Sequence, residues 1–126
     1  MSTEELITTL KDGSGMARAR AASDLGQTGD SKAITALYDA LEDKNPTVRS
    51  NAAFALGELD DCAAASKLIP LLEDADQWVR KSTAKALGML RATEAEAALE
   101  KALNDPSDQV QKNARRSLEQ IRGEST

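Results

Sequence analysis

The sequence predicts an all-α fold, a solenoid of four helix-pair repeats with eight helices in total. Three observations support this fold class. A shift of 31 positions aligns the chain of 126 residues with itself without insertions. Each 31-residue unit carries apolar residues at helical spacing twice. Aromatic residues make up only 2% of the chain, so leucine and alanine must build the core, which suits closely packed helices better than a sheet.

The repeat register is visible in columns of identical residues. Leucine columns are Leu6, Leu37, Leu68 and Leu99; Leu10, Leu41, Leu72 and Leu103; and Leu25, Leu56, Leu87 and Leu118. We therefore expect one domain over residues 1–122, made of repeats 1–28, 29–59, 60–90 and 91–122. A disordered tail is expected at 123–126.

The first helix of each repeat is predicted at 3–11, 31–42, 62–73 and 93–104. Side chains that accept hydrogen bonds from first-turn amides stand before or at these starts. The expected caps are capping boxes of Ser2 with Glu5 and of Thr93 with Glu96, and the carboxylates of Asp30 and Asp61.

The second helices are predicted at 15–28, 46–59, 77–90 and 108–121. One equivalent position before each of them holds a capping residue, namely Ser14, Asn45, Asp76 and Ser107. Pro46 is then expected at the first helical position, where its missing N–H costs nothing. Connections of two to four residues imply antiparallel neighbours.

These units resemble HEAT-like repeats. The resemblance rests on Asp-Lys-Asn-Pro-Thr-Val-Arg at 43–49 followed by Ala-Ala-Phe-Ala-Leu-Gly at 52–57, and on Trp-Val-Arg at 78–80 followed by Ala-Lys-Ala-Leu-Gly at 84–88. They are most similar to the short subclass of phycobilisome lyase subunits, across essentially the whole chain. The resemblance implies a right-handed α-α superhelix whose second helices line the concave side.

Recurring acids and bases allow two interpretations. They are Asp12, Asp43 and Asp74, with Arg18, Arg49 and Arg80. Such an array could be catalytic or bind phosphate, but in HEAT-like repeats residues of this kind form a hydrogen-bonded ladder between stacked units, which we favour. Gly26, Gly57 and Gly88 likewise indicate close helix approach, because no glycine-rich cradle for phosphate surrounds them.

Composition disfavours catalysis. The chain has no histidine, which removes the usual zinc ligand and the usual general base near neutral pH. Its one cysteine, Cys62, stands at a predicted helix start; a redox role is open, but a small structural role is favoured because it has no histidine partner. We expect a non-enzyme without catalytic residues, metal or cofactor.

No long apolar stretch indicates a signal peptide or membrane span, so a cytoplasmic protein is expected.

The fourth repeat places polar residues on the stacking face. Glu96, Glu100, Arg115 and Glu119 stand in columns that are apolar or small in repeats two and three. A solenoid end without a further unit must be wettable, so we expect a carboxyl-terminal cap on a complete protein.

One flank of the second helices lies off the core arc and carries bulky side chains. In repeat two this flank is Thr47, Asn51, Phe54 and Glu58. Met16, Phe54, Trp78 and Met89 would form an exposed apolar cluster typical of an interface. The alternative is that these side chains pack sideways between adjacent second helices.

Charge is divided between the two helix sets. The second-helix segments 14–28, 45–59, 76–90 and 107–122 carry a net charge of +5, whereas the first-helix segments 1–13, 29–44, 60–75 and 91–106 carry −9. The cations on the flank are Arg20, Lys81, Lys85, Lys112 and Arg116. They make it locally basic, which favours an acidic partner; a merely solvated charged face is the alternative.

The leading functional prediction is a protein-binding or scaffold module that presents this aromatic and basic flank to a protein or peptide. Its predicted partner-binding residues are Met16, Arg20, Asn51, Phe54, Glu58, Trp78, Lys81, Lys85, Met89, Lys112 and Arg116.

The resemblance also allows an accessory subunit of a chromophore lyase or related modifying enzyme. The HEAT-like hydroxylases of a lysine derivative hold iron with histidine and glutamate pairs, which this chain cannot supply. Nucleic acid is disfavoured by a net charge of −5 and a pI of about 4.8.

Overall fold

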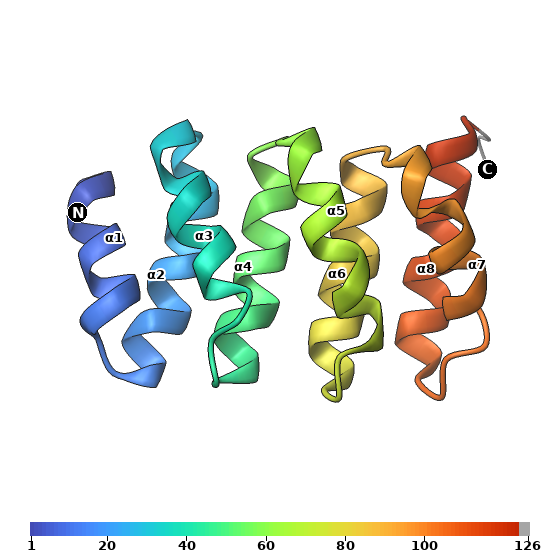
Figure 1. Ribbon diagram of the computed structural model, residues 1–126, viewed down its shortest axis with the longest axis horizontal. Coiled ribbons are helices and arrows are strands. Elements are labelled where there is room, and N and C mark those ends of the chain that lie inside the picture. The colour runs from blue at the N-terminus through green and yellow to red at the C-terminus, as the bar shows by residue number, and fades with distance from the viewer. Residues whose placement is uncertain (124–126) are drawn as a thin grey trace.

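A computed structural model describes residues 1–123 and shows four helix pairs arranged in chain order along one axis, with the N-terminus and residue 123 at opposite ends (Figure 1). The helices are α1 (Thr3–Asp12), α2 (Gly15–Thr28), α3 (Ile34–Ala40), α4 (Pro46–Glu58), α5 (Ala65–Leu68), α6 (Gln77–Met89), α7 (Glu96–Ala102) and α8 (Asp108–Arg122). The all-α solenoid predicted from the repeat is therefore confirmed. Gly123 caps α8, and the rest of the expected tail lies outside the described residues.

The second helices begin where the sequence places their caps. The side chains of Ser14, Asn45, Asp76 and Ser107 each accept a hydrogen bond from an amide of the first turn. Pro46 occupies the first turn of α4 as predicted. A satisfied first-turn amide typically contributes about 1 kcal/mol, so these four positions set the register of the layer.

The first helices of repeats two to four start with a 3-10 turn, unlike α1. These turns are η1 (Ser31–Ala33), η2 (Cys62–Ala64) and η4 (Thr93–Ala95). Asp30 and Asp61 cap the first two, and Ser2 with Glu5 forms the predicted capping box at α1. The capping box predicted for Thr93 and Glu96 is wrong: Thr93 lies inside the turn, and the cap position belongs to Ala92, which has no side-chain acceptor.

The predicted first helix of repeat three is broken by Pro70. After α5 the chain continues as a 3-10 segment, η3 (Ile69–Glu73), with Pro70 in its first turn. Proline lacks an N–H and its ring clashes with the carbonyl four residues back, so an α-helix cannot run through this position without distortion. The first-helix layer is consequently less regular than the second.

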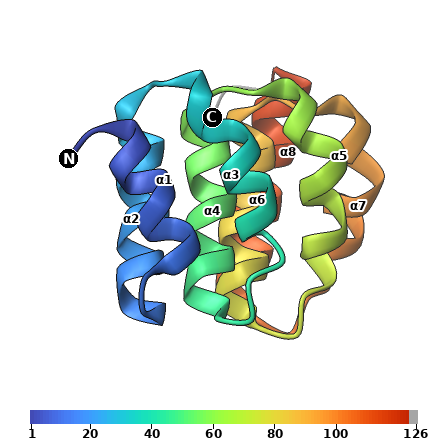
Figure 2. The same cartoon turned by 60° about the vertical axis from the view of Figure 1, so that its left-hand side comes forward.

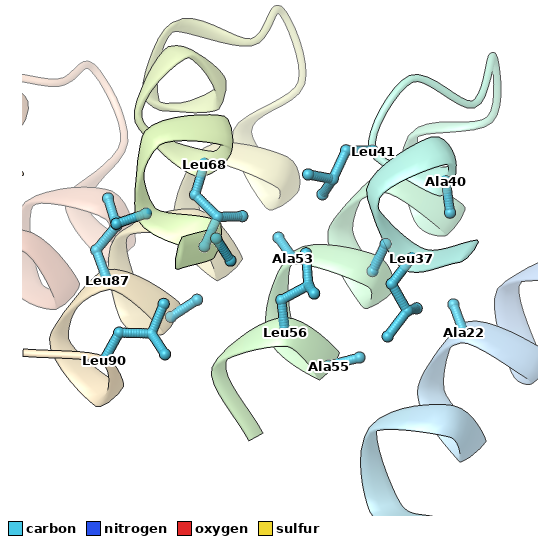
Figure 3. Close-up of a cluster of buried hydrophobic side chains, with 14 of the residues drawn as sticks. Ala22, Leu37, Ala40, Leu41, Ala53, Ala55, Leu56, Leu68, Leu87 and Leu90 are labelled. Atoms are coloured by element: carbon cyan, nitrogen blue, oxygen red, sulfur yellow. The ribbon is translucent and has the colours of Figure 1, made fainter. Parts of the chain in front are cut away.

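The core lies between the two layers and is built from the leucine columns. Leu25, Leu37, Leu56, Leu68 and Leu87 are completely buried. Figure 3 shows leucines of both layers lying between the helices, with Ala55 of α4 pointing toward Ala22 of α2. Full burial of one leucine contributes about 1.5–3 kcal/mol, so repetition of these columns supplies most of the packing energy.

An arginine–aspartate ladder joins consecutive repeats at one edge of the stack. One arginine in each of α2, α4 and α6 makes two hydrogen bonds to the aspartate 25 residues later, in the pairs Arg18–Asp43, Arg49–Asp74 and Arg80–Asp105. The Arg18 guanidinium holds the pKa of the Asp43 carboxyl below its usual value. Each aspartate also accepts from a loop amide two residues on. The ladder interpretation is thus confirmed for Asp43 and Asp74 with the three arginines. It is wrong for Asp12, which is exposed and lies outside the ladder, since each arginine pairs with the aspartate of the following repeat and Asp105 is the third acid.

Glycines let the second helices approach one another closely. A Cβ on Gly26 would lie 2.7 Å from the Cα of Ala55, and one on Gly57 would lie 3.1 Å from the Cα of Ala86. Each second helix packs extensively on the next, whereas the first helices touch one another little (Figures 1 and 2). The second helices therefore form the more closely packed of the two layers.

Candidate functional site

The candidate site is the outer face of α2, α4, α6 and α8, hereafter the second-helix face. Every residue predicted to bind a partner is exposed or half-buried. Trp78 is 52% exposed and Met16 81% exposed, which is far more than packing between helices would leave. Phe54 and Met89 are half-buried. The alternative of sideways packing therefore fits Phe54 and Met89 in part, but not Trp78 or Met16.

On this face, a lysine ammonium lies over each of two aromatic rings. The Nζ of Lys81 lies 5.2 Å from the centroid of the Trp78 ring, within one helix. The Nζ of Lys85, on α6, lies 5.5 Å from the centroid of the Phe54 ring on α4. Cation–π contacts of this kind hold the lysine chains against the rings. Apolar surface and positive charge thus meet at the same place on the face.

Met16 and Arg20 lie apart from these rings, at the N-terminal end of the stack. They line a pocket of about 330 Å³ together with Leu6, Ala17 and Asp24. Asp24 is the repeat-one equivalent of Ala55 and Ala86, the small residues that contact Gly26 and Gly57. The structure therefore separates the predicted apolar cluster into an end group around Met16 and a middle group around Phe54 and Trp78.

Between α6 and α8 the second-helix face is shallow. Lys85, Met89 and Arg116 border a hollow of only about 40 Å³, together with Asn113 and Gln120. Larger hollows lie on the other layer: a cavity of about 600 Å³ opens between η3 and α7, lined in part by Pro70 and Ala98. Sequence reasoning did not find this cavity, which depends on the broken helix at Pro70 and on the spacing of the first helices.

Asn51 is engaged within the fold. Its side-chain nitrogen donates to the backbone oxygen of Ala19 on α2 over 2.8 Å. Asn113 donates in the same way to the carbonyl of Lys81, and Ser82 bonds to Ser50. The column of small polar residues at these positions was the available signal for a row of bonds between second helices. Asn51 can still offer its side-chain oxygen to a partner.

Glu58 lies against the backbone of Gly26, one repeat earlier. Burial raises the pKa of its carboxyl. Within residues 1–123 it forms no salt bridge. It is the one acidic group among the predicted partner-binding residues and lies at the C-terminal end of α4.

The remaining candidates behave as structural or isolated groups. Cys62 is a free, exposed thiol. In the part of the chain that the structure describes, no three His, Cys, Asp or Glu side chains gather where they could hold a metal ion. The polar residues predicted at the end of the stack are partly paired, since Arg122 contacts Glu96 and Glu100 at 3.1 Å each. None of the helices within residues 1–123 combines the length and apolar character needed to cross a membrane.

The sequence pattern of HEAT repeats matches residues 3–76 and 65–126, which together cover almost the whole chain. The chain belongs to the HEAT-repeat family. No curated protein matches it.

Solved structures similar to this HEAT-repeat chain include two natural proteins and one engineered protein. Human deoxyhypusine hydroxylase in complex with glycerol aligns with a TM-score of 0.79 and 28% identity, over 98% of this chain and 44% of the hydroxylase. The complex of CpcE and CpcF of phycocyanin lyase from Nostoc sp. PCC7120 gives a TM-score of 0.71 and 27% identity, over 98% and 66%. The engineered protein gives 0.75 and 23%, over 98% and 64%, which shows the fold alone. The chain thus spans less than two thirds of each of them.

Proposed function

We propose that this HEAT-repeat chain is a non-catalytic scaffold module whose second-helix face binds an acidic protein or peptide. The observation that carries the proposal is the half-exposed ring of Trp78 on α6 and the half-buried ring of Phe54 on α4, with a lysine over each ring. Tryptophan is enriched among residues that dominate binding energy, and exposed apolar groups rimmed by charge mark interfaces. The net positive charge of the second-helix segments favours acidic partners and speeds their association.

The test is partner capture from extracts of the native host with a double variant, Phe54→Ala with Trp78→Ala. A protein that docks on this face should be lost from the variant, because both apolar anchors are gone while the core is untouched. Its binding to purified wild type should then be measured by calorimetry and should be weakened at least tenfold in the variant, roughly 1.4 kcal/mol.

A matched control removes similar apolar surface from the first-helix layer, in the variant Ile69→Ala with Leu71→Ala. Both residues are half-buried in η3, in the first-helix layer, where they pack against the core. Circular dichroism must show that both double variants remain folded. Equal recovery of every partner by wild type, variant and control would contradict a role for the second-helix face.

The likeness to the CpcE–CpcF complex of phycocyanin lyase supports a second candidate, an accessory subunit of a chromophore lyase or related modifying enzyme. The fold alone transfers function poorly, so this candidate rests on that likeness. Purified protein should then bind a bilin or change the rate at which a bilin is attached to a candidate subunit. Neither binding nor a change in rate would remove the candidate.

A further inference from the structure

Repeats three and four carry two pairs of cations at equivalent positions on the second-helix face. Lys81 and Lys85 lie four residues apart on α6, and Lys112 and Arg116 lie four residues apart on α8. Each pair therefore forms a fork along one helix, with its members about 6 Å apart along the helix axis. We call the four residues the cation forks.

The two forks are held side by side by hydrogen bonds from residues next to them. Asn113, which follows Lys112, donates to the carbonyl of Lys81 over 3.1 Å. Ser117, which follows Arg116, donates to the carbonyl of Ala84, next to Lys85. The backbone of α8 is thereby fixed against that of α6 at both ends of the forks, so the relative position of the four cations belongs to the rigid part of the fold.

The cation forks lack acidic partners of their own. Within residues 1–123 none of the four forms a salt bridge, whereas the ladder residues Arg18, Arg49 and Arg80 each pair with an aspartate. Like charges four residues apart on a helix repel one another. The ammonium groups of Lys81 and Lys85 also rest on aromatic rings, which removes part of their hydration. A carboxylate bound at each fork would reduce the repulsion between its two cations and form the salt bridge that the fork lacks.

The distance between α6 and α8 determines which backbone conformation such a partner needs. Packed helices lie about 8–10 Å apart, so carboxylates that reach both forks must repeat at that distance. An extended segment with polyproline II geometry turns once every three residues and rises about 9 Å per turn, which presents every third side chain to the same side at the required spacing. In a β-strand, side chains on one face recur about every 6.6 Å, which does not match.

We infer that the cation forks bind an extended acidic protein segment with a carboxylate at every third residue, running across α6 and α8 rather than along them. This inference rests on the proposed function and specifies the ligand of that face. Only a small hollow of about 40 Å³ lies beside Lys85 and Arg116, so the segment would lie on the surface rather than in a pocket. Nucleic acid is the less favoured ligand. The first-helix segments carry a net charge of −9, which would repel those parts of a long polyanion that extend beyond the forks.

The experiment measures the affinity of three labelled probes for the purified chain by fluorescence anisotropy at one salt concentration. The first probe repeats Glu-Pro-Ala four times, the second has the same composition with a glutamate at every second residue, so that no two glutamates are three residues apart, and the third is an oligothymidine of equal length. Wild type should bind the first probe about tenfold more tightly than the second, because only that spacing serves both forks.

Two double variants locate the site. Lys112→Gln with Arg116→Gln removes one fork and should weaken binding of the first probe about tenfold. Lys11→Gln with Lys32→Gln removes two exposed cations from the first-helix layer and should leave it unchanged. All four side chains are exposed, so the variants should melt like wild type, which a thermal scan checks.

Three results would overturn the inference: equal affinity for the two glutamate probes, an equal loss in both double variants, or tighter binding of oligothymidine. The proposed function is judged separately. A natural partner that is lost by Phe54→Ala with Trp78→Ala, yet retained by Lys112→Gln with Arg116→Gln, would leave the scaffold role standing and reject the forks as its basis.

Discussion

Tyr38 links two repeats through its hydroxyl. That group donates to the carboxylate of Asp61, which also caps η2 by accepting from the amide of Ala63. The ammonium of Lys67 lies 5.0 Å from the centre of the tyrosine ring. Burial, together with the bond to Asp61, raises the pKa of Tyr38 to about 12 from an ordinary value of 10.0. The phenol is thus held in its neutral, donating form.

Because Tyr38 is the chain's only tyrosine, tyrosinate absorbance reports on it alone. A pKa raised on folding gives stability that is complete below the unfolded value of 10.0 and is lost as the pH rises through about 12. We expect a native titration midpoint near 12 that returns to about 10 in denaturant. Asp61→Asn should lower the midpoint only in part, because burial is the larger cause. A native midpoint at 10 would contradict the contact.

Single residues also show where sequence reasoning stops. The caps Ser14, Asn45, Asp76 and Ser107 could be predicted because a capping bond is local, spanning two or three positions. The bond from Asn51 to Ala19 joins residues 32 positions apart and depends on how two helices pack, so the residue types alone did not reveal it. Predicting Thr93 as a cap failed because the 3-10 turn begins at Thr93 itself, which leaves the cap position to Ala92.

At the scale of elements, glycine sets the distance between second helices. A methyl group on Gly26 would lie 2.7 Å from the Cα of Ala55, a backbone atom that can retreat only if α4 moves. At Gly57 the nearest atoms are 3.1 Å away, so a shift of a few tenths of an ångström would make room. The recurrence of glycine in this column predicted close approach, but the difference between the two interfaces is visible only in the structure.

This difference predicts graded costs for two matched variants. Gly26→Ala should lower the free energy of unfolding by about 1–3 kcal/mol, because overpacking outweighs the better helix propensity of alanine. Gly57→Ala should be near neutral, since a small shift allows the propensity gain of about 1 kcal/mol to offset the strain. Urea denaturation of both variants and wild type provides the measurement. A larger loss for Gly57→Ala than for Gly26→Ala would show that side-chain contacts, not the backbone of α4, limit the spacing.

For the molecule as a whole, the charge pattern and the repeat predicted which face carries the bulky residues. They did not predict how deep the hollows on that face are. Position on a helix face follows from helical periodicity, so Trp78 and Met16 are exposed as expected. Depth depends on curvature, which arises from the summed spacing of both layers. The hollow between α6 and α8 is only about 40 Å³, while the cavity of about 600 Å³ lies in the other layer, next to Pro70. Neither property is encoded in a single repeat.

The stack predicts a gradient of local stability. Within residues 1–123, α4 and α6 each have second helices on both sides, whereas α1 and α8 belong to the end repeats. In a linear array the free energy of each repeat adds to that of its interfaces, so a unit with one neighbour opens more readily. Hydrogen exchange followed by mass spectrometry should find the slowest amides in α4 and α6 and faster exchange in α1 and α8.

A surface variant tests whether this gradient is local. Arg122→Ala removes the salt bridges from α8 to Glu96 and Glu100, which are partly exposed and contribute less than about 1 kcal/mol each. Exchange should then speed up in α7 and α8 while that of α2 and α4 stays at the wild-type rate, because an end repeat can open alone. A uniform increase across all helices would instead mean that the chain opens only as one cooperative unit, so that binding at repeats three and four would stabilise every repeat equally.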